Sequence, residues 1–83
     1  MTRQLKIESF DVLLGRRLKQ FRKIAGFTQA QAAQRIGLSR PQYCNIEHGR
    51  SGLLCAHLWK LAELYDVSSD TLLSRIDRDW LKL

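Results

Sequence analysis

Two copies of one helix-start signal, eleven residues apart, constrain the fold of this chain more than any other feature. Thr28 and Gln31, and again Ser39 and Gln42, fit the Ser/Thr-x-x-Gln capping box. In this motif each of the two side chains bonds a backbone N–H at the helix start. Gly37 lies between the copies, where a glycine can end the first helix. Two short helices joined by a three-residue turn form a helix-turn-helix pattern.

Helical spacing of apolar residues extends along the rest of the chain and predicts an all-α fold of five helices. Ser9 is the expected N-cap of the first helix and Gly26 its end. Gly49 is expected to end the third helix, and Ser68 or Ser69 to begin the fifth. The residues expected to face inward are, helix by helix, Phe10, Leu14, Leu18, Phe21 and Ala25; Ala30, Ala33 and Ile36; Tyr43 and Ile46; Leu58, Leu61, Ala62 and Tyr65; and Leu72, Ile76, Trp80 and Leu83.

Length and composition limit the class of protein. Eighty-three residues with 45% hydrophobic and 27% charged side chains are typical of one globular domain. No apolar run approaches the roughly 18 residues of a membrane span, and the opening ten residues lack the apolar core of a secretory signal. With two cysteines only, we expect a reduced, cytoplasmic protein. The expected parts are an N-terminal arm (1–8), four helices (9–67, with the helix-turn-helix at 28–48) and a C-terminal helix (68–83) suited to dimerisation.

The positive charge is confined to the first fifty residues. They carry ten Lys and Arg against three acids, a net charge of +7, whereas residues 51–83 carry four against five. A basic half of this kind indicates a polyanionic partner such as nucleic acid. The near-neutral half suits protein contacts.

Sequence motifs over residues 14–74 resemble the lambda-repressor/Cro-like (XRE-type) helix-turn-helix DNA-binding family. The resemblance rests on Thr28-Gln29, the turn glycine Gly37, Ile46-Glu47-x-Gly49 and Val67-Ser68-x-x-x-Leu72-Leu73, all in order at the family's spacing. It implies a five-helix DNA-binding domain whose third helix enters the major groove of double-stranded DNA.

The resemblance also implies roles for individual residues. Gln29 matches a phosphate-binding glutamine, while Arg22 and Glu47 match a structural ion pair. On the third helix Arg40 is the candidate for guanine and Gln42 or Asn45 for adenine. Pro41 and Cys44 occupy reading positions with poor hydrogen-bonding side chains, and Leu53-Leu54 replaces the family's usual Pro-Ser cap. Further candidates for phosphate contact are Ser39, Arg16, Arg17, Lys19, Lys23, Arg35 and Arg50.

Other kinds of site receive little support. Cys44, His48, Cys55 and His57 do not have a common zinc-finger spacing, so we expect no metal and no cofactor. The histidines lack an evident acid or nucleophile partner, so we expect no enzyme. Cys44 could instead be a redox-sensitive thiol, an idea that only its position supports.

Two segments remain open to different interpretations. The stripe of Leu72, Ile76, Trp80 and Leu83 can pack on its own domain or form a dimer interface, which we favour. Residues 5–7 can form a short strand or an arm that reaches DNA. The function expected from the sequence is a small homodimeric transcriptional regulator at an operator. The alternative is an antitoxin, or another protein-interaction module of this fold, with a toxin as partner and weak DNA binding.

Overall fold

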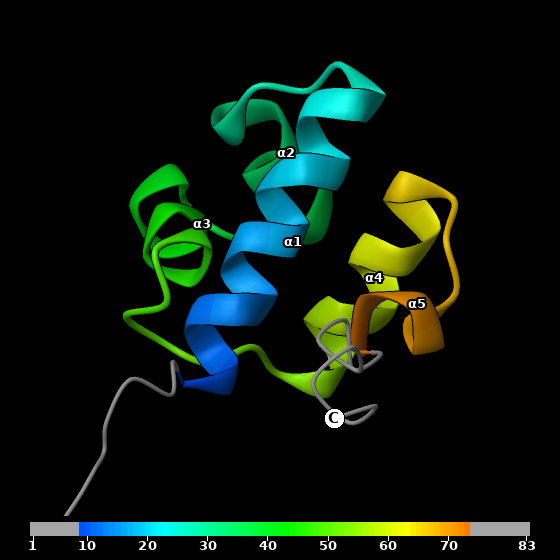
Figure 1. The fold of residues 1–83 in the computed structure, drawn as a ribbon. Coiled ribbons are helices and arrows are strands. Elements are labelled where there is room, and N and C mark those ends of the chain that lie inside the picture. The colour runs from blue at the N-terminus through cyan, green and yellow to red at the C-terminus, as the bar shows by residue number, and fades with distance from the viewer. Residues whose placement is uncertain (1–8, 74–83) are drawn as a thin grey trace, which may run out of the picture.

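The computed structural model describes residues 9–73, which form five α-helices and no strand (Figure 1). The helices are α1 (Phe10–Ala25), α2 (Gln29–Ile36), α3 (Arg40–Glu47), α4 (Cys55–Tyr65) and α5 (Ser69–Leu73). α1 runs through the middle of the domain and contacts α3, α4 and α5, while α2 packs on α3 and α4. The all-α class expected from the sequence is confirmed. None of the helices in this part of the chain is long and apolar enough to cross a membrane.

The first three helices begin at the expected caps. The hydroxyl of Ser9 accepts a hydrogen bond from the Val12 N–H at 3.2 Å, and both capping boxes, at Thr28 and Ser39, are complete. The N-cap residue of α4 is Leu54, which provides no side-chain cap, in line with the replacement of the usual Pro-Ser. Its C-cap residue is Asp66, whose φ of 56° places a non-glycine residue in the left-handed region.

The core lies where these helices meet, and its largest fully buried side chains are Tyr43, Leu18, Ile36, Leu61 and Leu72. Two expectations about inward faces are wrong. In α2, Ala32 is buried beside Ala33, whereas Ala30 is exposed. In α1, Phe10 and Ala25 are exposed, and they are the first and last residues of the helix.

Leu72 has a different position from the one expected of a dimer interface. It is 1% exposed and packs in the core of its own domain, because α5 lies on α1 and α4. This corrects its assignment to a surface for a second subunit. Ile76, Trp80 and Leu83, the other members of the stripe, lie outside the described residues, as do Leu5 and Ile7.

Candidate nucleic-acid interface

α3 has one buried and one exposed side. Its inward side chains are Tyr43, Ile46 and Glu47, which pack against α1, α2 and the core. The exposed residues are Arg40, Pro41, Gln42, Asn45 and His48, with Cys44 half-buried among them. The candidate base-reading residues therefore lie together on the surface of one short helix.

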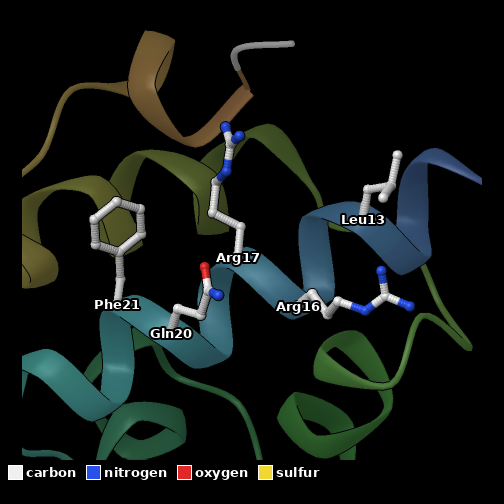
Figure 2. Close-up of a pocket in the computed structure, with 5 residues that line it drawn as sticks. All are labelled: Leu13, Arg16, Arg17, Gln20 and Phe21. Carbon is white, nitrogen blue, oxygen red and sulfur yellow. The ribbon is translucent and has the colours of Figure 1, made fainter. Parts of the chain in front are cut away.

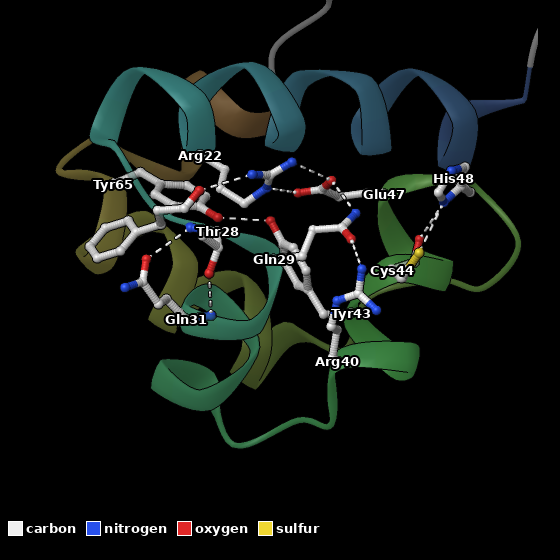
Figure 3. Close-up of polar contacts among 11 residues, drawn as sticks. Arg22, Thr28, Gln29, Gln31, Arg40, Tyr43, Cys44, Glu47, His48 and Tyr65 are labelled. Atoms are coloured by element: carbon white, nitrogen blue, oxygen red, sulfur yellow. Dashed lines mark hydrogen bonds and ion pairs between the residues drawn. The ribbon is translucent and has the colours of Figure 1, made fainter.

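A buried ion pair joins α1 to α3. Arg22 Nε donates to Glu47 Oε2 at 2.6 Å and Arg22 Nη2 to Oε1 at 3.2 Å, as Figure 3 shows. The two side chains are only 9% and 2% exposed. A third guanidinium nitrogen, Nη1, donates to the Phe27 carbonyl oxygen at 2.9 Å. The ion pair that the family resemblance implies is thus present. The hydrogen bonds of the Arg22 guanidinium all go to residues of the same domain, Glu47 and Phe27.

The Glu47 carboxyl stays ionised in this setting. Burial raises its pKa, but hydrogen bonds from Arg22, Tyr43 and Gln29 outweigh burial and hold the pKa below its usual value. The hydrogen bond to Glu47 in turn raises the pKa of Arg22. Tyr43 also bonds the hydroxyl of Tyr65 across the core, with 2.7 Å between the two oxygens.

A line of contacts leads from this buried pair to the surface. Gln29, the first residue of α2, donates through Nε2 to Glu47 Oε1 at 3.1 Å. Its Oε1 accepts from Arg40 Nη2 at 3.4 Å (Figure 3). The candidate phosphate residue and the candidate guanine reader therefore touch each other. Sequence reasoning placed both residues but missed their contact, which depends on how α2 and α3 cross.

Gln42 completes the capping box at the start of α3. Its Oε1 accepts the Ser39 N–H at 2.8 Å, and Ser39 Oγ accepts the Gln42 N–H at 3.2 Å. Bidentate contact with adenine needs both the oxygen and the nitrogen of an amide side chain. The oxygen of Gln42 is thus engaged in the cap in the free protein, and its reading of adenine remains a prediction, as does that of Asn45, the other exposed amide on α3.

The basic candidates separate into two groups. Arg16, Lys19, Lys23 and Arg50 are exposed on α1 and on the loop after α3. Arg17 points toward α5, where Nη1 donates to the carbonyl oxygens of Thr71 at 2.6 Å and Leu72 at 3.2 Å (Figure 2). It therefore holds the fold together and is not directed at a phosphate, which corrects that expectation.

Arg35 also has a neighbour within the domain. Its guanidinium lies over the ring of Phe27, 5.3 Å from the centroid, in a groove that α2 forms with α4. A cation over an aromatic face is attracted by the ring's electrons. Arg35 thus contributes to packing at the far end of α2 from Gln29, and its phosphate role remains a prediction.

Cysteine and histidine come together at one point only within residues 9–73. Cys44 Sγ and His48 Nδ1 are 3.3 Å apart on α3, and the same nitrogen lies 2.8 Å from the Cys44 carbonyl oxygen. No third metal-ligating side chain joins them in this part of the chain. Cys55 and His57 belong to the start of α4, and both cysteines are free thiols among the described residues.

An all-helical domain in which a tight turn joins two short helices, the second with an exposed face beside basic side chains, belongs to the helix-turn-helix class of DNA-binding proteins. Comparison with known sequences agrees: residues 15–78 match the sequence model of a helix-turn-helix domain family. This chain belongs to that family, of the lambda-repressor/Cro-like (XRE) type.

Two relatives illustrate the similarity. The HTH-type transcriptional regulator ImmR of Bacillus subtilis is 39% identical over 62 residues, which is 75% of this chain and 49% of that protein. The chain thus spans about half the length of this curated relative. The crystal structure of the restriction-modification controller protein C.AhdI from Aeromonas hydrophila superposes with a TM-score of 0.69 at 30% identity, over 74% of this chain and 92% of that one. Neither relative is named as an enzyme.

Proposed function

We propose that this protein is a sequence-specific transcriptional regulator that binds double-stranded DNA at an operator as a homodimer. The observation that carries the proposal is the exposed side of α3, where Arg40 and Asn45 project from a helix that the buried Arg22–Glu47 pair fixes to α1. A reading helix needs rigid support, because a displacement of about 1 Å removes a bidentate contact. The names of both relatives, a transcriptional regulator and a controller protein, support the same class.

In this proposal α3 enters the major groove and its side chains read base edges. Arg40 would bond O6 and N7 of guanine, and Asn45 would bond adenine. Gln29, at the N-terminus of α2 where backbone N–H groups are free, would contact a phosphate and release Arg40 to the base. Ser39, Lys23 and Arg50 are further candidates for phosphate contact.

The spacing of half-sites on DNA supports the proposed homodimer. Symmetric half-sites lie about 34 Å apart, so two copies of α3 are needed to read an operator. Because Leu72 is buried in the core of its own domain, the dimer interface would use the surface near α5 and the segment beyond it. The proposed contacts are Ile76, Trp80 and Leu83. Replacement of Ile76 by Asp is expected to give monomers in analytical ultracentrifugation and to weaken operator binding.

The proposal is tested by fluorescence anisotropy on the DNA upstream of the protein's own gene and on a scrambled duplex, at about 50 and 200 mM salt. We expect the upstream DNA to remain bound at the higher salt and the scrambled DNA to be released. Arg40→Ala should reduce discrimination by about 1–3 kcal/mol. Lys60→Ala, which removes an exposed positive charge from α4, should leave this discrimination unchanged. Equal affinity of the wild type for both duplexes would refute the regulator.

A second candidate is a protein-interaction module of the same fold, such as an antitoxin. Trp59 on α4 is 66% exposed and Leu54 at its start is 67% exposed, and apolar side chains of this size favour protein contacts. Pro41 and the engaged Gln42 also leave α3 with few base readers. Weak, salt-sensitive DNA binding together with copurification of the product of the adjacent gene would favour this function.

A further inference from the structure

A partly exposed stripe of side chains runs along α1, beside the side that faces the core. Its members recur at alternating steps of three and four residues, and they are Phe10, Leu13, Arg17, Gln20 and Ile24. This is the spacing of the a and d positions of a coiled coil, so the five side chains share one face of the helix. Ile24 is 79% exposed and Phe10 56% exposed, so both ends of the stripe present apolar surface to a partner.

A groove of about 280 Å³ occupies the middle of the stripe. Its walls are Leu13, Arg16, Arg17, Gln20 and Phe21 (Figure 2). Leu13 and Phe21 are half-buried and form the apolar part of the wall, whereas Arg16 and Gln20 are exposed. The volume is several times the roughly 30 Å³ of liquid volume that one water molecule takes up. The groove therefore has room for a large apolar side chain.

The chain carries a second stripe of the same kind, which starts at the end of α5. Leu73, Ile76, Trp80 and Leu83 recur at steps of three, four and three residues. Leu73 is the last residue of α5 and is exposed. The other three lie outside the described residues, in the segment for which the sequence predicts a C-terminal helix. Two helical stripes with a and d spacing pack when the side chains of one fit between those of the other.

The charges beside the two stripes are complementary. On α1 the basic residues Arg16 and Lys23 each precede a stripe position by one residue, which places them in the flanking g positions. On a helix over 73–83, Asp77 and Asp79 flank the second stripe on its two sides, in positions e and g. An acid therefore faces the basic flank of α1 whichever way the two helices run. The basic residues of the segment fall on the far side of such a helix, and they are Arg75, Arg78 and Lys82.

The length of the α1 stripe favours the segment of a second copy over the chain's own. Arg17, the middle member of the stripe, bonds the carbonyl oxygens of Thr71 and Leu72, so the chain's own segment begins beside that midpoint. At a rise of about 1.5 Å per residue, roughly 10 Å of stripe lies on either side of Arg17, whereas a helix over 73–83 is about 15 Å long. The chain's own segment would overrun one end and leave the other end exposed. The segment of a second copy has no such tether and covers the groove together with an apolar end.

We propose that the α1 stripe and its groove bind residues 73–83 of a second copy, and that this exchange is reciprocal. The inference rests on the proposed homodimer and deepens it, because it names the surface that receives Ile76 and Trp80. Twofold symmetry then gives each dimer two identical contacts of this kind, here called seams. Gly15, which packs on α3, lies on the opposite side of α1 from the stripe, so the seams leave the exposed face of α3 open to DNA.

The first test compares Ile24→Glu on α1 with Leu54→Glu at the start of α4, since both replace an apolar side chain that is largely exposed. Sedimentation velocity without DNA measures the dimer, and melting curves show that each variant is folded. I24E should raise the dissociation constant of the dimer about tenfold or more, because a charge replaces an apolar contact in both seams. L54E should keep the wild-type value. An unchanged dimer in I24E, or a larger loss in L54E, overturns the proposal.

The second test distinguishes exchange from packing of the segment on its own domain. I24E has a damaged α1 stripe and an intact segment, whereas Ile76→Asp has the reverse. A heterodimer of the two variants contains one fully intact seam, which neither variant forms alone. Fluorescence energy transfer between differently labelled samples should therefore be stronger in a mixture of I24E and I76D than in a mixture of two I76D samples. Equal transfer in the two mixtures overturns the exchange, and is the result expected if the segment packs on its own domain.

These measurements separate the seam from the proposed regulator. If I24E and I76D complement each other but the wild type does not discriminate the upstream duplex, the regulator is refuted and the seam is supported. If the wild type is a dimer that discriminates the upstream duplex and I24E has no effect on dimerisation, the seam alone is refuted. A wild type that stays monomeric both with and without the upstream duplex refutes the seam and the homodimer together.

Discussion

Gly15 of α1 packs directly on the backbone carbonyl oxygen of Glu47 at the end of α3, with no room for a side chain between the two helices. A Cβ on Gly15 would also lie 2.6 Å from the Ile46 carbonyl oxygen. A glycine inside a helix is about 1 kcal/mol less favourable than alanine. Here it lets α1 approach α3 closely enough for Arg22, two turns along, to reach the Glu47 carboxylate.

Gly15→Ala should therefore destabilise the protein despite its better helix propensity. The new methyl group overlaps backbone atoms that cannot move aside, and overpacking of this kind costs about 1–3 kcal/mol. Thermal unfolding should shift down by roughly 4–8 °C per kcal/mol. Gly52→Ala is the matched control, since its Cβ would meet only the Asp11 carboxylate, at 3.8 Å. Equal melting temperatures for the two variants would mean that the helices do not meet at Gly15.

Arg22→Ala should lower stability before it alters DNA specificity. Removal of one partner leaves the Glu47 carboxylate buried without its counter-charge, a loss of about 3–5 kcal/mol. Urea unfolding measures this directly, and discrimination between operator and scrambled DNA should persist wherever the variant is folded. Lys23→Ala removes an exposed positive charge from the same helix and should leave stability nearly unchanged. An unaltered unfolding curve with lost DNA binding would assign Arg22 to the DNA instead.

Glu47 should give the protein an acid-sensitive stability. Its pKa in the folded state lies below the usual 4.5, so in the unfolded state the carboxyl binds a proton more readily. The stabilisation is complete above pH 4.5 and is lost as the pH falls through the folded-state pKa. Glu47→Gln should be less stable at neutral pH and should show a weaker decline on acidification. A variant with the wild-type pH profile of melting temperature would exclude Glu47 as the source.

The sequence predicted those parts of the fold that depend on contacts within a short segment. The caps at Ser9, Thr28 and Ser39 depend on a side chain and a backbone group at most three residues apart, so the sequence predicted them correctly. The choice of Ala32 over Ala30 in the core depends on how α2 rotates against its neighbours. Periodicity over eight residues, four of them alanine or isoleucine, does not determine that rotation.

The contacts of long polar side chains at the interface were harder to predict from the sequence. Nothing in the local sequence separates Arg16 from Arg17, yet Arg17 bonds carbonyl groups 54 and 55 residues away. Gln42 fitted both a cap and a base reader, and the cap is the role that the free protein forms. The Arg22–Glu47 pair was found because the family pattern supplied a contact that spacing alone does not contain.

Arg17→Gln tests the assignment of this arginine to the fold. Its charged hydrogen bonds hold the carbonyl groups of Thr71 and Leu72 in α5, and since the contact is partly exposed we expect a loss of about 1 kcal/mol. Hydrogen exchange of the α5 amides should increase more than that of α2. The salt slope of DNA binding should stay at the wild-type value, because no phosphate contact is removed. A slope reduced by about 0.9 would return Arg17 to the DNA interface.

The buried pair of Tyr43 and Tyr65 should limit stability in alkali. Burial raises the pKa of Tyr65 to about 12, and burial together with hydrogen bonds to Glu47 and Tyr65 raises that of Tyr43 further. An unfolded tyrosine ionises near pH 10, so stability is complete below pH 10 and declines as the pH rises toward 12 and beyond. Ultraviolet absorbance of tyrosinate should appear together with loss of helical circular dichroism. In Tyr65→Phe, which removes one of the two ionisable hydroxyls, the fall in stability per pH unit should be smaller. Ionisation of both tyrosines near pH 10 in a protein that keeps its helices would show that the 2.7 Å contact between the hydroxyls is not buried in solution.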